Sequence, residues 1–271
     1  MQAVVQYAAP FHRGTNVYRS REACVAVLRM AESARLPWWN DRCSQFVREA
    51  EGCPLFHGKS GGTFPILSIE GLDGVGKSLV TRTLGEKLGG SVFSTPPSEW
   101  NDIRPLYMDE PESVARCFYS ASNYMAAVPI EAASHTHPVI VDRWWSSTCA
   151  MALANQKTVS ELPPSGDEIY RWPEDLLRFD HGYYLHVDEA VRTARIRARA
   201  PEQEEEKRLS AKEEMRRTAE EVYNRIHLFT KVETNTYRHA VNFILNDLTK
   251  KGLSHRAVLF SDKELNEVKP F

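Results

Sequence analysis

Residues 69–78 read Ile-Glu-Gly-Leu-Asp-Gly-Val-Gly-Lys-Ser, and this stretch decides the fold. Its part from Gly71 to Ser78 matches the pattern G-x-x-x-x-G-K-[ST] in full. The apolar run Ile66–Ile69 precedes it and an amphipathic segment, 77–88, follows it. Because the pattern requires a strand before it and a helix after it, we predict a strand, a phosphate-binding loop and a helix in this order.

Each residue type in this loop has a physical reason. Glycines let backbone N–H groups wrap an anion without Cβ clashes, and the helix N-terminus adds a favourable dipole. Lys77 is placed to contact the β- and γ-phosphates, and the Ser78 hydroxyl to bind Mg²⁺. We therefore expect a nucleoside triphosphate, ATP, to be bound by Gly71, Leu72, Asp73, Gly74, Val75, Gly76, Lys77, Ser78 and Leu79.

Short apolar runs alternate with helical patterns further along the chain. Strands are predicted at Val139–Val141 and Tyr183–Val187, and helices at Ser146–Ala154 and Glu189–Arg199. This alternation is typical of βαβ units with a parallel sheet covered on both faces. The predicted fold class is α/β, a P-loop NTPase three-layer fold whose parallel sheet is flanked by helices.

The first sixty residues have a different character. Helices are predicted at Arg21–Leu36 and Asp41–Glu51, and a glycine-rich stretch over Gly52–Gly62 is typical of a linker. We therefore divide the chain into an N-terminal helical extension or linker over 1–62, a P-loop domain over 63–252 and a C-terminal tail over 253–271.

The composition excludes several classes of partner. The chain has 271 residues with 34 Lys and Arg against 36 Asp and Glu, so it lacks the cationic excess of proteins that adhere to nucleic acid or anionic membranes. Its longest apolar runs are far shorter than the ~20 residues of a membrane helix. We expect neither a nucleic acid nor a membrane as partner.

Cysteines and the first residues bear on the compartment. The five cysteines form no Cys-x-x-Cys pair, which favours buried free thiols in a reducing compartment. Three arginines and no acid precede Glu22, a pattern that fits a weak mitochondrial targeting segment or a start inside a longer precursor. Both a mitochondrial and a cytoplasmic location stay open.

A second strand ends in Asp142-Arg143-Trp144. An acid at the carboxyl end of a strand beside the P-loop is placed to hold Mg²⁺, and the adjacent arginine can bind a phosphate. The sequence has no Asn-Lys-x-Asp motif, which a GTPase would normally show. These partner motifs favour a small-molecule kinase.

Four stretches together resemble the thymidylate kinase family of nucleoside monophosphate kinases: IEGLDGVGKS (69–78), FYSASNY (118–124), VIVDRWWSS (139–147) and the arginine series Arg192, Arg195, Arg197 and Arg199. The stretches TPP (95–97), DEP (109–111) and WPEDLL (172–177) look closer to the mitochondrial UMP-CMP kinase 2 branch of that family. The resemblance covers Phe64 to about Leu248.

The resemblance implies transfer of the ATP γ-phosphoryl group to a pyrimidine nucleoside monophosphate: CMP or dCMP, UMP or dUMP, or dTMP. It assigns Asp73 to the sugar 3′-hydroxyl, Asp142 to Mg²⁺ and Arg143 to the acceptor phosphate. It also implies that Phe118 or Tyr119 stacks on the acceptor base. Because the family often forms dimers, a homodimer is a further expectation.

Three departures from the family pattern change the expected details. Asn123 stands where an arginine is common, and its amide can face either cytosine or uracil. Trp144 replaces a tyrosine near the sugar. Since Gly74 and Val75 carry no charge, the resemblance assigns the transition-state arginine to the lid around the acid-rich residues 202–207, with Arg195, Arg199 and Arg208 as candidates.

The other two arginines of the series, Arg192 and Arg197, are expected on a solvated helix face, paired with neighbouring acids. Two other functions stay open. A deoxynucleoside kinase would need a base carboxylate near the acceptor, and Glu70 could supply it. A non-catalytic nucleotide-binding module would place the working part in the N-terminal segment.

Overall fold

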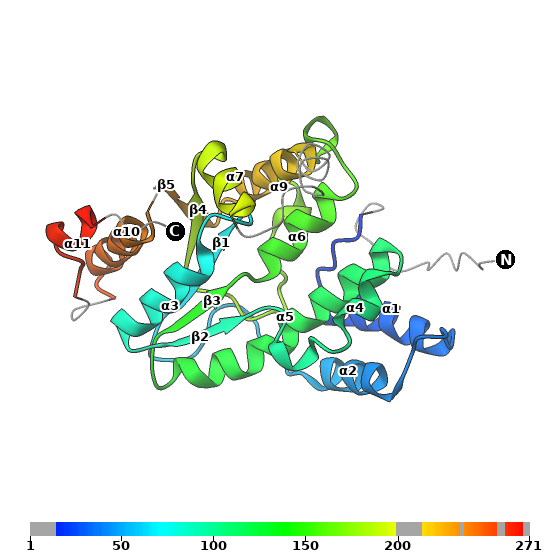
Figure 1. The fold of residues 1–271 in the computed structure, drawn as a ribbon. Helices are drawn as coiled ribbons and strands as arrows, with labels where there is room; N and C mark the ends of the chain where they lie inside the picture. Colours follow the sequence, from blue (N-terminus) through cyan, green and yellow to red (C-terminus); the bar gives the residue numbers. More distant parts are fainter. Residues whose placement is uncertain (1–14, 199–212, 234–235, 254–257, 268–271) are drawn as a thin grey trace.

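The structure, a computed structural model, describes residues 15–198, 213–233, 236–253 and 258–267 (Figure 1). The predicted lid over 202–207, together with Arg199 and Arg208, lies outside the described residues. So does most of the arginine-containing start of the chain, including Arg13.

The described chain contains one five-stranded sheet in which every paired neighbour is parallel. The strand order is β2-β3-β1-β4-β5, so the strand that leads into the P-loop occupies the centre. The strands are β1 (Ile66–Gly71), β2 (Ser91–Ser94), β3 (Val139–Asp142), β4 (His181–His186) and β5 (Phe229–Glu233). The three predicted strands are confirmed, while β2 and β5 were not predicted.

Helices cover both faces of this sheet. The helix predicted over 77–88 is confirmed with the same bounds. The helices are α1 (Arg21–Ser33), α2 (Asp41–Gly52), α3 (Lys77–Leu88), α4 (Arg104–Met108), α5 (Glu112–Ser134), α6 (Trp145–Ala154), α7 (Glu189–Arg197), α9 (Glu213–Ile226), α10 (Tyr237–Lys250) and α11 (Asp262–Asn266). Three short 3₁₀ turns are η2 (Ser98–Trp100), η3 (Val159–Glu161) and η4 (Glu168–Tyr170).

Alternating side chains of the central strands divide the core between the two faces. Ile66 joins one buried cluster with α5, α6 and α9, whereas Leu67 and Ile69 join a second cluster with α3 and α10. Figure 1 shows α3 and α10 on one face of the sheet and α5 and α6 on the other. The predicted three-layer α/β fold is therefore confirmed.

The two N-terminal helices pack against α5 and belong to the same buried cluster as the sheet. Leu28 of α1 and Phe46 of α2 are fully buried there. Before α1, the Tyr18 hydroxyl donates to the Ser113 carbonyl over 3.0 Å, and Trp145 Nε1 donates to the Tyr18 carbonyl over 3.1 Å. Both helices begin where a side chain caps them.

All five cysteines are free and buried, which confirms the prediction of buried thiols. Burial raises the pKa of Cys53 to about 11, so this thiol stays protonated at neutral pH. Within the described ranges, no helix has the length and apolarity that crossing a membrane requires.

Candidate active site

The loop between β1 and α3 has the backbone of a phosphate cradle. Gly71, Gly74 and Gly76 have φ angles of 147°, 85° and 96°, a region that residues with a Cβ seldom adopt. A Cβ at Gly71 would lie 2.7 Å from the Leu185 carbonyl oxygen. Among the described residues, no side chain caps the start of α3 at Gly76, so its N–H groups are placed to bind an anion.

Ser78 and Asp142 meet at the carboxyl ends of β1 and β3. The register that pairs Ile69 with Asp142 brings the acid beside the P-loop, and the Ser78 hydroxyl donates to Asp142 Oδ2 over 3.0 Å. Asp142 Oδ1 is buried and has no hydrogen-bond partner among the described residues. A hydroxyl and a carboxylate oxygen without a partner fit the oxygen ligands that Mg²⁺ prefers.

Lys77 is buried and bends back over the loop. Its Nζ donates to the Leu72 carbonyl over 2.7 Å. Burial, together with the charge of Arg143, lowers the pKa of Lys77 to about 8. The negative charge of a bound phosphate would therefore stabilise the charged form of Lys77.

Arg143 occupies the end of β3 in a left-handed backbone conformation with φ of 68°. Its backbone N–H donates to the Ile69 carbonyl over 3.1 Å, and its Nη1 donates to the Ser147 hydroxyl over 3.2 Å. Its Nη2 lies 2.5 Å from Asp73 Oδ1. Although burial opposes ionisation of Asp73, the charges of Arg143 and Lys77 hold the pKa of this carboxyl below its ordinary value.

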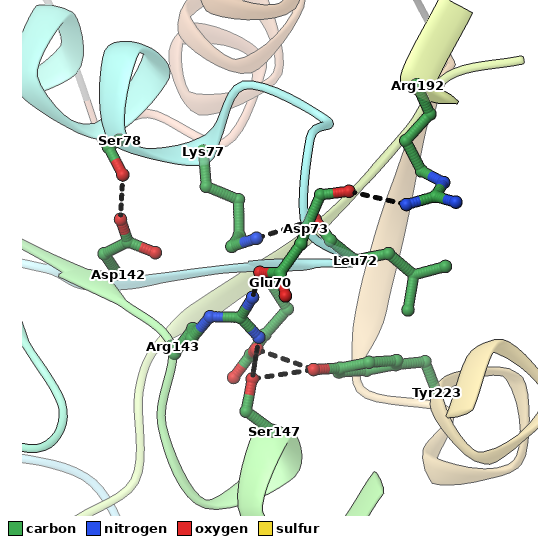
Figure 2. A network of polar contacts seen from close by, with 10 residues as sticks. All are labelled: Glu70, Leu72, Asp73, Lys77, Ser78, Asp142, Arg143, Ser147, Arg192 and Tyr223. Carbon is green, nitrogen blue, oxygen red and sulfur yellow. Dashed lines mark hydrogen bonds and ion pairs between the residues drawn. The ribbon is translucent and has the colours of Figure 1, made fainter. Parts of the chain in front are cut away.

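Glu70 lies beneath this pair and is fully buried (Figure 2). Its Oε1 accepts from the Trp144 N–H over 2.8 Å, while Oε2 accepts from the hydroxyls of Ser147 and Tyr223 over 2.6 and 3.0 Å. Burial raises the pKa of Glu70 despite these donors. Because both oxygens are bound within the protein core, the geometry does not support Glu70 as a base for an acceptor hydroxyl.

Helix α7 lays two arginines against the P-loop backbone. Arg192 pairs with Glu189 through two contacts of 2.6 Å, and its Nη1 donates to the Asp73 carbonyl over 3.0 Å (Figure 2). Arg195 Nη1 donates to the carbonyls of Val75 and Gly74 over 3.2 and 3.4 Å. The expected pairing of Arg192 is confirmed, but its expected solvation is wrong because the P-loop covers it.

A cavity of about 660 Å³ opens in front of these groups, within the range of small-molecule sites. The P-loop supplies one part of its wall, and the end of β2 with the residues that follow it supplies another, through Ser94, Thr95 and Pro96. Asp142 and Arg143 at the end of β3 supply a third part. The rest comes from four helices, with Arg104 on α4, Arg116 and Tyr119 on α5, Ser147, Thr148 and Met151 on α6, and Arg195 and Ile196 on α7.

The two predicted stacking aromatics lie in different places. Tyr119 lines the cavity, and its hydroxyl accepts from Arg104 Nε over 3.1 Å. Phe118 is fully buried and stacks on Phe46 and Tyr107 at 4.9 and 5.0 Å between ring centroids. Of the two alternatives, only Tyr119 can meet a base in this structure.

Two other predicted contacts are displaced into the core. The Trp144 side chain is fully buried against Trp172, and its backbone N–H alone joins the Glu70 network. Asn123 is also fully buried, and its Nδ2 donates to the Thr148 hydroxyl over 3.1 Å. The expected direct contact of these two side chains with a substrate is therefore not supported, because neither lines the cavity, whereas Thr148, the partner of Asn123, does.

Sequence reasoning did not single out Ser147, Thr148 or Tyr223. Ser147 and Thr148 could have been predicted from the sequence. They lie in the first turn of the helix that follows Asp142-Arg143, four and five residues after Arg143, and this spacing places their side chains near the end of the strand. No local signal marks Tyr223, whose hydroxyl reaches Glu70 from α9, 153 positions away in sequence.

Comparison with known proteins agrees with this geometry. The thymidylate kinase family profile matches residues 69–244. The human mitochondrial UMP-CMP kinase 2 is 36% identical over an alignment of 220 residues that covers 78% of this chain and 46% of that protein. The chain thus spans about half the length of the curated relative that it matches.

Among solved structures, the thymidylate kinase of Candida albicans aligns with a TM-score of 0.53 at 18% identity, covering 73% of this chain and 96% of the other. The deoxyadenosine kinase of M. mycoides aligns with a TM-score of 0.49 at 21% identity, covering 68% and 99%. At this identity the first likeness supports the fold alone.

Proposed function

Because the chain belongs to the thymidylate kinase family, we propose that it transfers the γ-phosphoryl group of ATP to a pyrimidine nucleoside monophosphate, which becomes the diphosphate. The observation that carries this proposal is that a single cavity is lined by the P-loop residue Lys77, by Arg143 and by Tyr119. A cation for each phosphate and an aromatic ring for a base are thus within reach of one bound pair of nucleotides.

The proposed roles follow the positions of the side chains. Lys77 and the N–H groups at the start of α3 bind the phosphates of ATP, and Arg143 binds the acceptor phosphate. Asp73, held by Arg143, faces the acceptor sugar, and Tyr119 stacks on its base. Thr148 accepts from Asn123, so its own hydroxyl hydrogen is available to a carbonyl or ring nitrogen of the base.

Ser78 and Asp142 would hold Mg²⁺, which when bound supplies positive charge that neutralises the phosphate oxygens. The acceptor phosphate is already an anion at neutral pH, so the protein has no proton to remove before transfer. What its own residues do is align the two phosphates and stabilise charge, through Lys77, Arg143 and Arg195. Arg199 stays a second candidate for the transition-state arginine.

Stacking on Tyr119 does not discriminate between bases, so the choice of a pyrimidine acceptor rests on the similarity to UMP-CMP kinase 2. The deoxynucleoside kinase alternative is not retained, since Glu70 is held in the core by three donors. A mitochondrial location and a homodimer stay predictions.

The test is a profile of ATP consumption and diphosphate formation with CMP, UMP, dCMP, dUMP and dTMP. We expect turnover with at least one of them, and none for Lys77→Ala at unchanged circular dichroism. Cytidine, uridine and thymidine serve as controls. Phosphorylation of a nucleoside in preference to every monophosphate would contradict the proposal, as would full turnover in Lys77→Ala.

A further inference from the structure

Helix α2 and the connection that precedes it lie against the outer side of a segment whose inner side lines the cavity. We name residues 95–110 the acceptor wall, because Thr95, Pro96 and Arg104 within it line the cavity. We name Trp38, Trp39, Arg42 and Phe46 the N-terminal brace. Contacts between the two groups span more than fifty positions of sequence, so the sequence alone gave no sign of them.

Arg42 of α2 makes three separate contacts with the wall. Its guanidinium lies 4.0 Å above the ring of Trp100, its Nε lies 3.2 Å from Asp102 Oδ2, and its Nη2 donates to the Glu99 carbonyl over 2.6 Å. A planar guanidinium can stack on a ring and donate in its plane at the same time. Arg42 therefore fixes the turn that leads into α4.

The aromatic members of the brace enclose Tyr107, which is fully buried. The Trp38 ring lies 5.2 Å from Tyr107, and Trp38 Nε1 donates to Glu110 Oε1. Phe46 packs edge-on against Trp100 at 5.1 Å and stacks on Phe118 at 4.9 Å. Aromatic pairs of this geometry add to the stabilisation that burial alone gives.

Helix α4 cannot hold its own position, because it has only five residues and its first turn has no side-chain cap among the described residues. Helices this short are not stable in water without tertiary contacts. Arg104 projects from this helix to the cavity, where its Nε donates to the Tyr119 hydroxyl. Packing by the brace therefore decides where Arg104 lies relative to Tyr119.

We propose that the N-terminal brace positions the acceptor wall, with Arg42 as a positioning residue, so that α2 and the connection before it determine the affinity for the acceptor nucleotide. The proposal rests on the proposed function in one respect, that the acceptor base binds beside Tyr119. It assigns a role in the site to a part of the chain that the motifs leave unexplained. Affinity for ATP does not depend on the brace, because the P-loop is held by β1, α3 and α7.

The experiment compares Arg42→Gln with Arg48→Gln in the full chain. Arg48 lies on the same helix, is exposed, and makes no contact with residues 95–110 in the described structure. The acceptor is the best of CMP, UMP, dCMP, dUMP and dTMP. Arg42→Gln should raise its KM about fivefold, a loss comparable to one exposed charged or cation–π contact, with the KM for ATP within twofold of wild type.

Two further results complete the comparison. Arg42→Lys should recover part of the acceptor affinity, since an ammonium can still meet Asp102 but cannot stack and donate together. Arg48→Gln should match wild type. The proposal is overturned if Arg42→Gln leaves the acceptor KM unchanged, or raises the KM of ATP and acceptor equally.

Hydrogen exchange separates this proposal from the proposed function. Amides of residues 98–110 should exchange faster in Arg42→Gln than in Arg48→Gln, because loss of the brace lets α4 open locally. Equal exchange rates of these amides in the two variants would overturn the proposed positioning role of the brace, whatever activity the variants show. If exchange differs but no monophosphate is phosphorylated by the wild-type chain, the proposed function fails while the positioning of the wall stands.

Discussion

Arg143 Nη2 and Asp73 Oδ1 form an ion pair of 2.5 Å that joins the end of β3 to the P-loop. The pair orients the Arg143 guanidinium toward the P-loop, where the proposed function places the acceptor phosphate. Its geometry depends on the guanidinium, which reaches Asp73 and Ser147 with separate nitrogens. An arginine in this position orients two groups that a single ammonium could not.

Arg143→Lys should therefore lower kcat/KM for the acceptor about 100-fold, which corresponds to roughly 2.7 kcal/mol of transition-state stabilisation. The charge is retained in this variant, but the simultaneous contacts are lost. Steady-state kinetics with both substrates varied will measure it. Arg171→Lys, at an exposed position outside the cavity wall, is the matched control. A loss below threefold in Arg143→Lys would show that charge alone suffices.

Lys77 gives the site a dependence on pH. Its pKa of about 8 means that the lysine is mostly charged at pH 7 and mostly neutral at pH 9. Phosphate favours the charged form, so ATP should bind about tenfold more weakly at pH 9 than at pH 7, with proton uptake on binding at the higher pH. Calorimetry in buffers of different ionisation enthalpy measures both effects.

The control for this dependence is Lys77→Met, which keeps the apolar stem and removes the titrating group. Its weaker binding should be flat between pH 7 and pH 9. A wild-type affinity that does not change over this range would contradict the assignment of Lys77 as the titrating contact.

Tyr223→Phe tests the link between α9 and the P-loop. The change removes one hydroxyl that bonds to Glu70 and Ser147 and leaves the buried carboxylate with fewer donors. We expect a loss of about 1–2 kcal/mol in the free energy of unfolding, together with a lower kcat for transfer. Urea denaturation and initial rates measure the two quantities.

Tyr184→Phe is the comparison for Tyr223→Phe, because Tyr184 packs on Tyr223 at 4.7 Å yet has no hydroxyl contact with Glu70 in the described chain. Its stability and rate should change little. Equal effects in the two variants would mean that packing, and not the hydroxyl, matters at this position.

Gly74→Ala should disturb the phosphate cradle. Gly74 has φ of 85°, and a Cβ there would lie 2.9 Å from Ile196 Cγ1 and 3.1 Å from the Arg192 carbonyl oxygen. The loop and α7 must then separate, so we expect ATP affinity to fall by about tenfold or more. Titration with ATP measures this directly.

Gly89→Ala isolates the cost of the backbone conformation itself. Gly89 is also left-handed, with φ of 62°, but a Cβ there meets nothing within 4 Å. This variant should lose about 1 kcal/mol of stability and keep its ATP affinity. If Gly74→Ala binds ATP as well as Gly89→Ala does, close packing of α7 on the loop is not required for binding.

The elements that could be predicted are those marked by a local motif or by a continuous apolar run. Strand β1 and the helix over 77–88 follow from one motif and one apolar run. Strands β2 and β5 escaped prediction because they lie at the two edges of the sheet, where β2 has no fully buried residue and β5 has only Val232.

Within the site, residues in the P-loop and at the end of β3 could be placed because parallel strands bring their carboxyl ends together. Helical phase was harder to predict. Phe118 and Tyr119 are neighbours that point about 100° apart, and nothing local says which one faces the cavity. Arg192 was predicted to be solvent-exposed because the P-loop, which buries it, lies 119 positions earlier in the sequence.

The hydrogen bonds of Glu70 have a consequence for how the protein folds. Its donors lie 74, 77 and 153 positions further along the chain. Closing such distant contacts is entropically costly, so they form after the local helices have formed. During synthesis, the strand that carries the P-loop emerges long before α9, and Arg143 gains its full support only when nearly the whole domain has been made. The P-loop motif is encoded early and locally, whereas the hydrogen-bond network that supports Arg143 is among the last features that the folding chain completes.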